Sequence, residues 1–298
     1  MKVLLTGSSG FIGGHLLKAA RARWGDADVT ALSSRPSETG KCLVYGPDFN
    51  LDNASRVAAA DTELLIHAGA FTPKNGAAAN DIDACNGNIA FTGMLLGVPM
   101  PALRKVVFLS TLDVYAPASG PLSETSAVQP ASLYGWSKLY GEQMVEHAAA
   151  QRGVSAQVLR IGHVYGPGEE RYAKFLPNAM RNIVNGKPVE LWGEGRELRS
   201  LIYIADVVQA ILAAAELPAS PGVINVVGDR ALSVRAVLER AIALSGRDIP
   251  LTQRAFDGKT RDFVFDTRKL KQHLLPEETD LDQGLRAELA HMERIVAA

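Results

Sequence analysis

The chain has 298 residues, a formal net charge of −1, and apolar and charged fractions of 47% and 21%. This length allows one large domain, or one domain with a smaller lobe. The near-zero charge gives no electrostatic reason to expect nucleic acid or an anionic membrane as a partner.

The remaining composition points to an ordinary protein of a reducing compartment. Its two cysteines, Cys42 and Cys85, do not form the pattern of a disulfide framework. The six histidines are scattered without ligand spacing, so we expect no metal site. The apolar run at the N-terminus is too short for a signal peptide, and no later run could span a bilayer. We therefore expect a cytoplasmic location.

The first element is a short apolar strand over residues 2–6, followed by a glycine-rich turn and an amphipathic stretch over residues 15–23. Gly7, Gly10 and Gly13 give this turn the spacing of a dinucleotide-phosphate loop. Gly7 and Gly10 would let the backbone approach a pyrophosphate at the helix N-terminus. Gly13 would let helix and strand pack closely. A glycine turn without a ligand is the weaker interpretation here.

The second strand, residues 28–32, ends in Ser33-Ser34-Arg35. A dinucleotide fold that prefers NAD usually places a carboxylate here, on the ribose 2′-hydroxyl. Two hydroxyls and a guanidinium suit a 2′-phosphate instead, which favours NADP over NAD. A surface arginine in a loop is the competing explanation.

Strands and helices then alternate along the chain. We expect strands over residues 43–46, 64–67, 105–110 and 156–161, and helices over residues 55–60 and 77–96 and around Tyr134. This βαβ alternation predicts an α/β protein with a Rossmann-like, doubly wound parallel sheet.

Beyond residue 165 the pattern is less regular. We expect strands over residues 188–192, 198–204, 223–227 and 263–265, and helices over residues 172–185, 206–216, 233–245, 267–273 and 280–297. Ser233 would cap the third of these helices. No clean linker separates the two halves. Residues 1–165 and 199–228 should therefore form the dinucleotide-binding domain, and residues 166–198 and 229–298 a smaller C-terminal α/β substrate lobe.

A tyrosine and a lysine stand one helical turn apart in the stretch after residue 132. If this stretch is helical, Tyr134 and Lys138 share a face, so a phenol and an ammonium can converge. An adjacent ammonium lowers the pKa of a phenol from its ordinary value of about 10. That suits proton exchange with a substrate hydroxyl or carbonyl. The pattern is short enough to arise by chance, so its weight depends on the other motifs.

Together, these motifs resemble the extended short-chain dehydrogenase/reductases, the NAD-dependent epimerase/dehydratase family, over nearly the whole chain. The segments that carry the resemblance are residues 6–13, 88–96, 110–115, 134–138 and 159–167, with Arg199 shortly before Tyr203 and Asp206. Each segment is weak alone, but their order and spacing are specific.

The resemblance implies a catalytic set of Thr111, Tyr134 and Lys138. Thr111 would hydrogen-bond the reacting oxygen of the substrate, and Tyr134 would be the general acid/base. Lys138 would bind the nicotinamide ribose and hold the pKa of Tyr134 down. Proton transfer at oxygen would then accompany hydride transfer at nicotinamide C4.

The resemblance also implies contacts to the cofactor. Besides Tyr134 and Lys138, the expected contacts are Gly7, Ser9, Gly10, Phe11, Ile12, Gly13, Ser33, Arg35, Asn50, Leu51 and Asn88. Asp48, Asn50 and Asp52 are alternatives for the adenine contact after the third strand, and Asn50-Leu51 is preferred.

A nucleotide-diphosphate sugar is the implied substrate. Arg199 follows a glycine hairpin at the position where relatives place a guanidinium on the diphosphate. A surface arginine in an ion pair is the alternative. His163 stands where many relatives have asparagine, and it would contact a sugar or phosphate or serve as a buried structural histidine. Asp113 is the remaining expected substrate contact.

Two departures from the family pattern narrow the reaction. Leu112 occupies the position of the first acidic residue of 4,6-dehydratases, and leucine cannot donate a proton, so we do not expect a dehydratase. Arg35 tilts the prediction towards a 4-ketoreductase that consumes NADPH, rather than a 4-epimerase that retains NAD. A reductase of a small carbonyl compound and a non-catalytic dinucleotide sensor remain alternatives.

The resemblance finally implies a homodimer, because relatives pair two helices per subunit in a four-helix bundle. The candidate helices lie near residues 77–96 and 131–150. The same apolar positions are also typical of a protein core.

Overall fold

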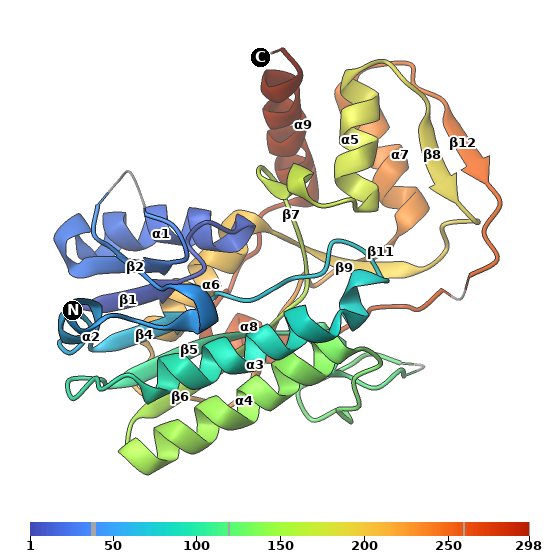
Figure 1. The fold of residues 1–298 in the computed structure, drawn as a ribbon. Coiled ribbons are helices and arrows are strands. Elements are labelled where there is room, and N and C mark those ends of the chain that lie inside the picture. The colour runs from blue at the N-terminus through green and yellow to red at the C-terminus, as the bar shows by residue number, and fades with distance from the viewer. Residues whose placement is uncertain (37–39, 119, 259, 298) are drawn as a thin grey trace.

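A seven-stranded parallel sheet forms the centre of the computed structural model, which describes residues 1–36, 40–118, 120–258 and 260–297 (Figure 1). Its strand order is β10-β6-β5-β4-β1-β2-β3, and every neighbouring pair is parallel. The strands are β1 (Val3–Thr6), β2 (Val29–Ser33), β3 (Cys42–Val44), β4 (Leu64–His67), β5 (Lys105–Thr111), β6 (Ser155–Ile161) and β10 (Ile224–Val226). The predicted Rossmann-like sheet is confirmed.

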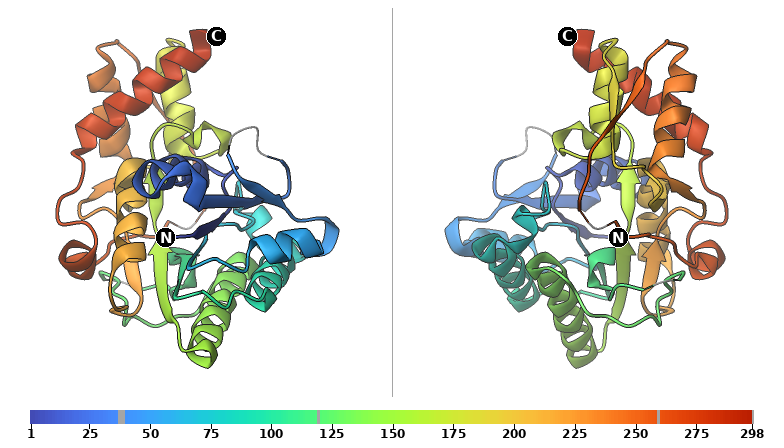
Figure 2. Two further views of the ribbon diagram at one scale, coloured as in Figure 1. Left: turned by 90° about the vertical axis from the view of Figure 1, so that its left-hand side faces the viewer. Right: turned by 90° about the vertical axis from the view of Figure 1, so that its right-hand side faces the viewer.

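Alternating side chains along the central strands explain why helices cover both faces of this sheet. In β1, Val3 and Leu5 pack with α1 (Phe11–Trp24) and α6 (Ile204–Glu216). Leu4 packs instead with α3 (Ile82–Gly97) and α4 (Leu133–Arg152), which lie side by side (Figure 2). Successive side chains of a strand point to opposite faces, so each face needs its own apolar layer.

The strand order places a ligand crevice at one end of the sheet. The chain runs outward through β2 and β3 on one side of β1, and through β4, β5 and β6 on the other. In open α/β sheets, ligands bind outside the carboxyl ends of the strands, where this order reverses. Here the reversal lies between β1 and β4. Their last residues, Thr6 and His67, are joined by a 2.8 Å hydrogen bond from Oγ1 to Nδ1.

A smaller lobe lies beyond the carboxyl ends of the strands (upper right in Figure 1). It contains α5 (Phe175–Val184), α7 (Val234–Ser245), α9 (Leu281–Ala297) and the parallel pair β8 (Val189–Trp192) and β12 (Leu251–Arg254). A three-stranded sheet, β11 (Ala231–Ser233), β9 (Leu198–Tyr203) and β7 (His163–Tyr165), joins the lobe to the main sheet. Val164 packs into the core beside the main sheet and Tyr165 into the core of the lobe.

The secondary structure differs from the predictions in three places. Strands β7, β11 and β12 were not predicted. The helix expected over residues 77–96 is interrupted at Asp81, whose carboxylate accepts a 3.0 Å hydrogen bond from the Ala84 N–H and so starts α3 anew. The strand expected over residues 263–265 is reduced to isolated bridges from Phe263 to Arg199 and from Phe265 to Leu122.

The remaining helices are short. α2 (Asn53–Ala58) follows β3, and α8 (Arg268–His273) returns to the main sheet, where Leu270 and Leu274 pack in the same core as β10.

The division into two domains stays a prediction. In the described part of the chain, no helix has both the length and the apolar character needed to cross a membrane. The described residues also contain no cluster of His, Cys, Asp or Glu that could hold a metal ion.

Candidate active site

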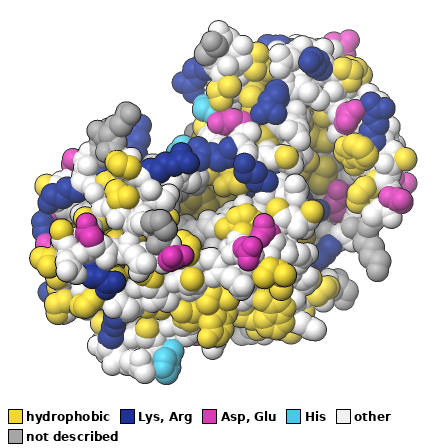
Figure 3. Space-filling view, in the orientation of Figure 1, with side chains coloured by type: hydrophobic (Ala, Val, Ile, Leu, Met, Phe, Trp, Pro, Cys, Tyr) yellow, Lys and Arg dark blue, Asp and Glu magenta, His cyan; other side chains and the backbone are white. Residues whose placement is uncertain are grey.

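A cavity of about 1160 Å³ opens at the carboxyl ends of the central strands. Its wall is formed by the glycine turn after β1, the end of β2, the segments after β4 and β5, the start of α4 and the segment from β6 through residue 174. Figure 3 shows the molecule hollowed between its two parts, with Lys and Arg side chains along the rim. The cavity therefore lies at the strand-order reversal, where the fold predicts a ligand.

The glycine turn forms one end of the cavity. Gly7 has a φ of +77°, and a Cβ added to it would lie 2.6 Å from the backbone nitrogen of Gly69. A Cβ on Gly13 would lie 1.9 Å from the carbonyl oxygen of Gly7. These two positions therefore require glycine. All of the predicted turn contacts, Gly7, Ser9, Gly10, Phe11, Ile12 and Gly13, line the cavity.

The predicted cofactor residues after β2 and β3 divide into two groups. Ser33 is buried and lines the cavity, and its Oγ accepts a 3.3 Å hydrogen bond from the Arg35 N–H. Arg35 and Asn50 are exposed and Leu51 is buried in the core, and none of the three is among the described residues that line the cavity. The Asp52 carboxylate caps α2, accepting a 2.7 Å hydrogen bond from the Ser55 N–H.

Two aromatic residues line the cavity near this point that sequence reasoning missed. Tyr45 and Phe49 have ring centroids 5.7 Å apart, and Phe49 packs 5.1 Å from Phe91 of α3. Phe49 has a φ of +59°, which is uncommon for a residue other than glycine. No sequence motif marks these rings.

Asn88 connects the cavity wall to the helix that carries Tyr134. Its Oδ1 accepts a 2.6 Å hydrogen bond from the Phe71 N–H, and its Nδ2 donates to the Phe71 carbonyl and to Ser137 Oγ, each at 3.2 Å. Asn88 also lines the cavity. It therefore fixes the segment after β4 against α4, and its expected contact with the cofactor stays a prediction.

Thr111, Tyr134 and Lys138 all line the same cavity. Thr111 is the last residue of β5, and Tyr134 and Lys138 lie in the first two turns of α4. Ser132 caps this helix by accepting a 3.1 Å hydrogen bond from the Gly135 N–H. A Cβ on Gly135 would lie 2.5 Å from the carbonyl oxygen of Asp113, so glycine lets α4 approach the end of β5.

The electrostatics of this group differ from the expectation. Burial raises the pKa of the Tyr134 phenol well above its usual range, and the charge of Asp113 raises it further. Hydrogen bonds with Thr111 and Thr72 act in the opposite direction. Burial also lowers the pKa of Lys138 to about 7. Lys138 therefore carries only part of its charge at neutral pH, and it is not among the groups that shift the pKa of Tyr134 here. Its expected effect on Tyr134 stays a prediction.

Asp113 opens into the cavity beside this group. The Thr111 hydroxyl donates to Asp113 Oδ2 over 3.4 Å, and the Asp113 N–H donates back to Thr111 Oγ1 over 3.3 Å. Burial raises the pKa of the Asp113 carboxyl, whereas the Thr111 hydrogen bond and the charges of Arg261 and Lys174 lower it. The predicted substrate contact thus lies next to the catalytic set.

His163 lines the cavity at the start of β7. Its ring packs edge-on against Phe263, with centroids 4.8 Å apart, and its Nδ1 has no hydrogen-bond partner among the described residues. Burial and the nearby charges of Arg199, Lys174 and Arg261 lower the pKa of His163 to about 3, so its ring is neutral at physiological pH. A neutral ring with one unpaired nitrogen can still hydrogen-bond a ligand.

Arg199 is not among the described residues that line this cavity. It lines a second one of about 300 Å³, close enough for its charge to act on His163. Its Nη1 donates to the carbonyls of Leu198 at 2.9 Å and Arg261 at 2.6 Å. The guanidinium groups of Arg199 and Arg261 stand 5.3 and 4.6 Å from the centroid of the Phe263 ring. In the described part of the chain no carboxylate lies within salt-bridge distance of Arg199, which does not favour the ion-pair alternative.

Arg261 and Lys174 are functional candidates that the sequence did not reveal. The Arg261 Nε is buried without a hydrogen-bond partner among the described residues, and Lys174 lines the cavity. Together with Arg199 they place three cations around His163. For Arg261, the available signal in the sequence was its position two residues before the weak strand pattern over residues 263–265.

Comparisons with known proteins agree with this geometry. The family described as the NAD dependent epimerase/dehydratase family matches residues 3–227. A UDP-glucose 4-epimerase of Azospirillum brasilense is 30% identical over 282 residues, covering 84% of this chain and 79% of the relative. A dTDP-4-dehydro-6-deoxy-D-allose reductase of a Streptomyces species is 26% identical over 318 residues, covering 98% and 95%.

A solved structure supports the same assignment. MoeE5 in complex with UDP-glucose and NAD superposes with a TM-score of 0.85 at 28% identity, covering 99% of this chain and 100% of that one. The family match spans the main sheet, the glycine turn and the Tyr134 helix. This chain therefore belongs to the NAD dependent epimerase/dehydratase family of enzymes.

Proposed function

We propose that this enzyme transfers hydride at a ring carbon, C4, of a nucleotide-diphosphate sugar. The observation that carries the proposal is that Thr111, Tyr134 and Lys138 meet in one cavity with the glycine turn. A phenol, a hydroxyl and an amine at one end, and a phosphate-binding turn at the other, are the parts that nicotinamide-dependent carbonyl chemistry needs.

The residues present fit a nicotinamide dinucleotide. The turn at Gly7 and Gly13 has no room for a Cβ, and α1 begins at Phe11 after Gly10, an N-cap residue that makes no side-chain hydrogen bond. Its first N–H groups are therefore available to a phosphate. Ser33 would contact the adenosine ribose, and Lys138 with Tyr134 the nicotinamide ribose. When bound, the nicotinamide supplies hydride donation and acceptance at carbon.

The protein's own residues would handle the proton and the position of the substrate. The pKa of Tyr134 is raised, so its phenol is protonated at neutral pH and can donate to a carbonyl oxygen. The Thr111 hydroxyl would hold that oxygen. Arg199, Arg261 and Lys174 would bind the diphosphate, because charge-assisted hydrogen bonds to guanidinium and ammonium groups are strong.

Among the possible reactions we propose a 4-ketoreductase that uses NADPH. Ser33 stands at the cavity end of β2 where an NAD-selecting carboxylate is usual, and Arg35 is exposed nearby. A 2′-phosphate would therefore meet hydroxyls and a cation. The second candidate is a 4-epimerase that retains NAD, which is favoured by the similarity to the Azospirillum epimerase and by the NAD bound to MoeE5.

Turnover with a panel of 4-keto and 4-hydroxy nucleotide sugars tests this proposal. A ketoreductase consumes one NADPH per keto sugar and prefers NADPH to NADH. An epimerase interconverts two 4-hydroxy sugars with no net change in cofactor. If only small carbonyl compounds lacking a nucleotide are reduced, the nucleotide-sugar proposal is wrong. If no compound changes and cofactor still binds, the sensor alternative is favoured.

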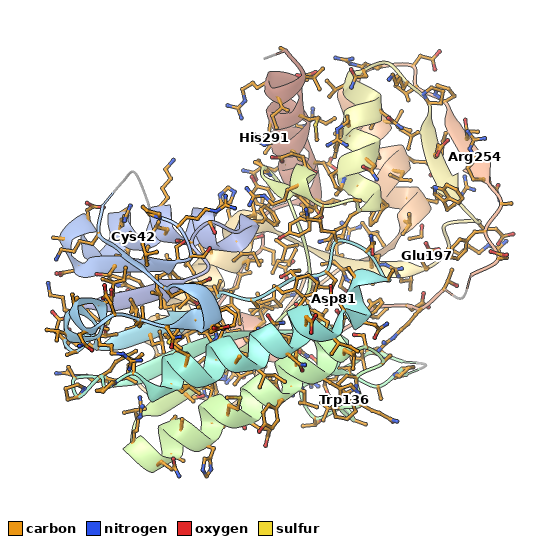
Figure 4. The ribbon with its side chains drawn as sticks, in the orientation of Figure 1. Cys42, Asp81, Trp136, Glu197, Arg254 and His291 are labelled. Carbon is orange, nitrogen blue, oxygen red and sulfur yellow. The ribbon has the colours of Figure 1, made fainter. Side chains whose placement is uncertain are left out.

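A homodimer through α3 and α4 is part of the proposal. Leu133, Trp136 and Tyr140 follow one face of α4 with exposed fractions of 40%, 51% and 56%, and Ile82 at the start of α3 is 64% exposed. Hydrophobic side chains gather over these helices in Figure 3, and Trp136 points away from the sheet in Figure 4. An apolar face of this kind is typical of an interface. The molecular mass in solution tests the homodimer, and Trp136→Glu is the variant expected to disrupt it. A cytoplasmic location also stays a prediction.

A further inference from the structure

A buried histidine stands at the point where the strand order reverses. His67 is the last residue of β4, is 1% exposed, and is not among the described residues that line the cavity. Its ring packs against Phe91 of α3 and Phe108 of β5, with centroids 5.3 and 5.4 Å apart. Burial and the nearby charge of Lys138 lower the pKa of His67 to about 3, so the ring is neutral at physiological pH. A neutral imidazole buried in this way needs one donor and one acceptor as partners.

Both ring nitrogens of His67 have a threonine partner. The Thr92 hydroxyl donates its proton to the Asn88 carbonyl over 2.8 Å, so Thr92 Oγ1 accepts from His67 Nε2, which is 3.0 Å away. The His67 proton is therefore on Nε2, and Nδ1 accepts a 2.8 Å hydrogen bond from Thr6 Oγ1. Thr6 Oγ1 in turn accepts a 2.8 Å hydrogen bond from the Gly69 N–H. A single tautomer of His67 satisfies this whole hydrogen-bond network.

On the Thr6 side the network reaches the glycine turn. Thr6 ends β1 and precedes Gly7, and a Cβ added to Gly7 would lie 2.6 Å from the Gly69 nitrogen. Gly7 and Gly69 both line the cavity. Because Thr6 Oγ1 holds the Gly69 N–H and is itself oriented by Nδ1 of His67, this histidine fixes the glycine turn against the segment after β4.

On the Thr92 side the network reaches the helix that carries Tyr134. Thr92 lies one turn after Asn88 on α3, and the Asn88 side chain is hydrogen-bonded to the Phe71 backbone and to Ser137 Oγ. The Ser137 hydroxyl donates to the Tyr134 carbonyl over 2.8 Å. The hydrogen bond between His67 and Thr92 thus attaches α3, and α4 beside it, to the end of β4.

We propose that His67 is a positioning residue for the dinucleotide, holding the glycine turn through Thr6 and the wall formed by α3 and α4 through Thr92. The two walls are thereby kept at one separation. The phosphate end of the cofactor depends on the Nδ1 hydrogen bond, and the nicotinamide end, beside Tyr134, depends on the Nε2 hydrogen bond. This inference rests on the proposed binding of a nicotinamide dinucleotide.

Two amide substitutions break these hydrogen bonds separately. In His67→Asn the amide oxygen can replace Nδ1 and accept from Thr6, but no group reaches Thr92. In His67→Gln the amide nitrogen can replace Nε2 and donate to Thr92, but no group reaches Thr6.

The two variants should therefore affect different constants. We expect His67→Gln to raise the dissociation constant of NADPH or NADH about tenfold, as for one lost buried hydrogen bond, and to keep kcat within about twofold. His67→Asn should keep the dissociation constant within about twofold and lower kcat about tenfold, because Tyr134 is displaced from the reacting atoms. Cofactor fluorescence measures the dissociation constant of whichever reduced cofactor the wild type binds more tightly.

A second readout needs no turnover. Amide hydrogen exchange, followed by NMR on the protein alone, should become faster at Gly69 in His67→Gln and at Phe71 in His67→Asn, relative to the other amides of β4 and β5. With ¹⁵N in the histidine rings, wild-type His67 should show a protonated Nε2 and an unprotonated Nδ1 at neutral pH. A proton on Nδ1 overturns the proposal.

Leu65→Ala is the matched control. Leu65 is 1% exposed, lies two residues before His67 on the same face of β4, and packs in an apolar core. The control should unfold at a lower urea concentration and keep the wild-type dissociation constant for the cofactor. If it weakens cofactor binding as much as His67→Gln does, or if both His67 variants change binding and exchange alike, His67 supports only the fold and the proposal is wrong.

Failure of the proposed function is seen separately. If the wild type converts no nucleotide sugar, the proposed reaction is wrong, and the cofactor-binding and exchange measurements still decide the role of His67. If the wild type binds neither NADPH nor NADH, both proposals are wrong.

Discussion

The two ends of the cavity are built in different ways. The glycine-turn end is formed by residues of one local segment, 7 and 9–13, where a strand meets a helix. The opposite end collects side chains from separate segments: Asp113, His163 and Lys174 line the cavity, and the charges of Arg199 and Arg261 act on His163 from nearby. A backbone site is determined by local sequence, because only glycine satisfies its geometry. A side-chain site depends on how distant segments come together.

We expect the largest effect on kcat at Tyr134, which lies between the two ends of the cavity. Tyr134→Phe removes the phenolic proton without changing the shape of the ring. We expect kcat to fall about 10³-fold, the middle of the range for a general acid. The melting temperature should change little, which can be checked by calorimetry. Retention of wild-type turnover would remove the basis for the enzyme mechanism.

The glycine-turn end should be intolerant of a single methyl group. Gly13→Ala would place a Cβ 1.9 Å from the Gly7 carbonyl oxygen, so strand and helix must move apart. We expect a loss of about 2 kcal/mol or more in the free energy of unfolding, typical of overpacking, and loss of cofactor binding. Gly14→Ala is the matched control. Its Cβ would meet only the Ser8 carbonyl oxygen at 3.5 Å, so this variant should be as stable as the wild type or more so. Equal destabilisation by both changes would contradict the close packing inferred at Gly13.

Burial of Lys138 should make the stability of the protein depend on pH. Its pKa is lowered from the model-compound value of 10.5 to about 7 by burial, so between these values the unfolded chain binds a proton that the folded chain does not. The stabilisation that depends on neutral Lys138 is therefore complete above pH 10.5, the pKa in the unfolded chain, and is lost as the pH falls towards 7. The free energy of unfolding of wild type relative to Lys138→Met should rise by about 2 kcal/mol from pH 7 to pH 9.

Urea unfolding of both proteins at several pH values measures this difference, and other titrating groups cancel in it. A flat difference would mean that Lys138 keeps an ordinary pKa in the folded protein.

The substrate end should tolerate single changes better, because several cations share the ligand. Arg199→Ala and Arg261→Ala should each raise the KM for a nucleotide sugar about tenfold, in line with one charge-assisted hydrogen bond. Arg254→Ala, which removes an exposed guanidinium paired with Glu190, is the control and should leave KM unchanged. An unaffected KM in both variants would favour a substrate without a diphosphate.

The same contrast explains what could be predicted from the sequence. The strands of the main sheet and the turn at Gly7 and Gly13 were predictable, because apolar runs and glycine spacing are local signals. β7, β11 and β12 were missed because they are only three or four residues long and are stabilised by pairing with distant strands. A family motif identified the Tyr134 helix, but not how deeply Lys138 is buried.

The substrate end was predicted less well, for a physical reason. The Arg261 carbonyl accepts a hydrogen bond from Arg199 across a separation of 62 residues, and no local pattern reveals such a contact. Arg35 and Asn50 were assigned by their positions after strands. Their side chains are exposed and are not among the described residues that line the cavity. Their roles stay predictions.

The most direct test of the central claim follows a hydrogen atom from cofactor to sugar. The enzyme is given NADPH carrying deuterium on the transferred C4 position together with a 4-keto nucleotide sugar, and the product is examined by NMR and mass spectrometry. The account predicts one deuterium at C4 of the sugar, incorporated about 10³-fold more slowly with Tyr134→Phe. A reduced sugar without deuterium at C4, or deuterium at another carbon, would contradict it.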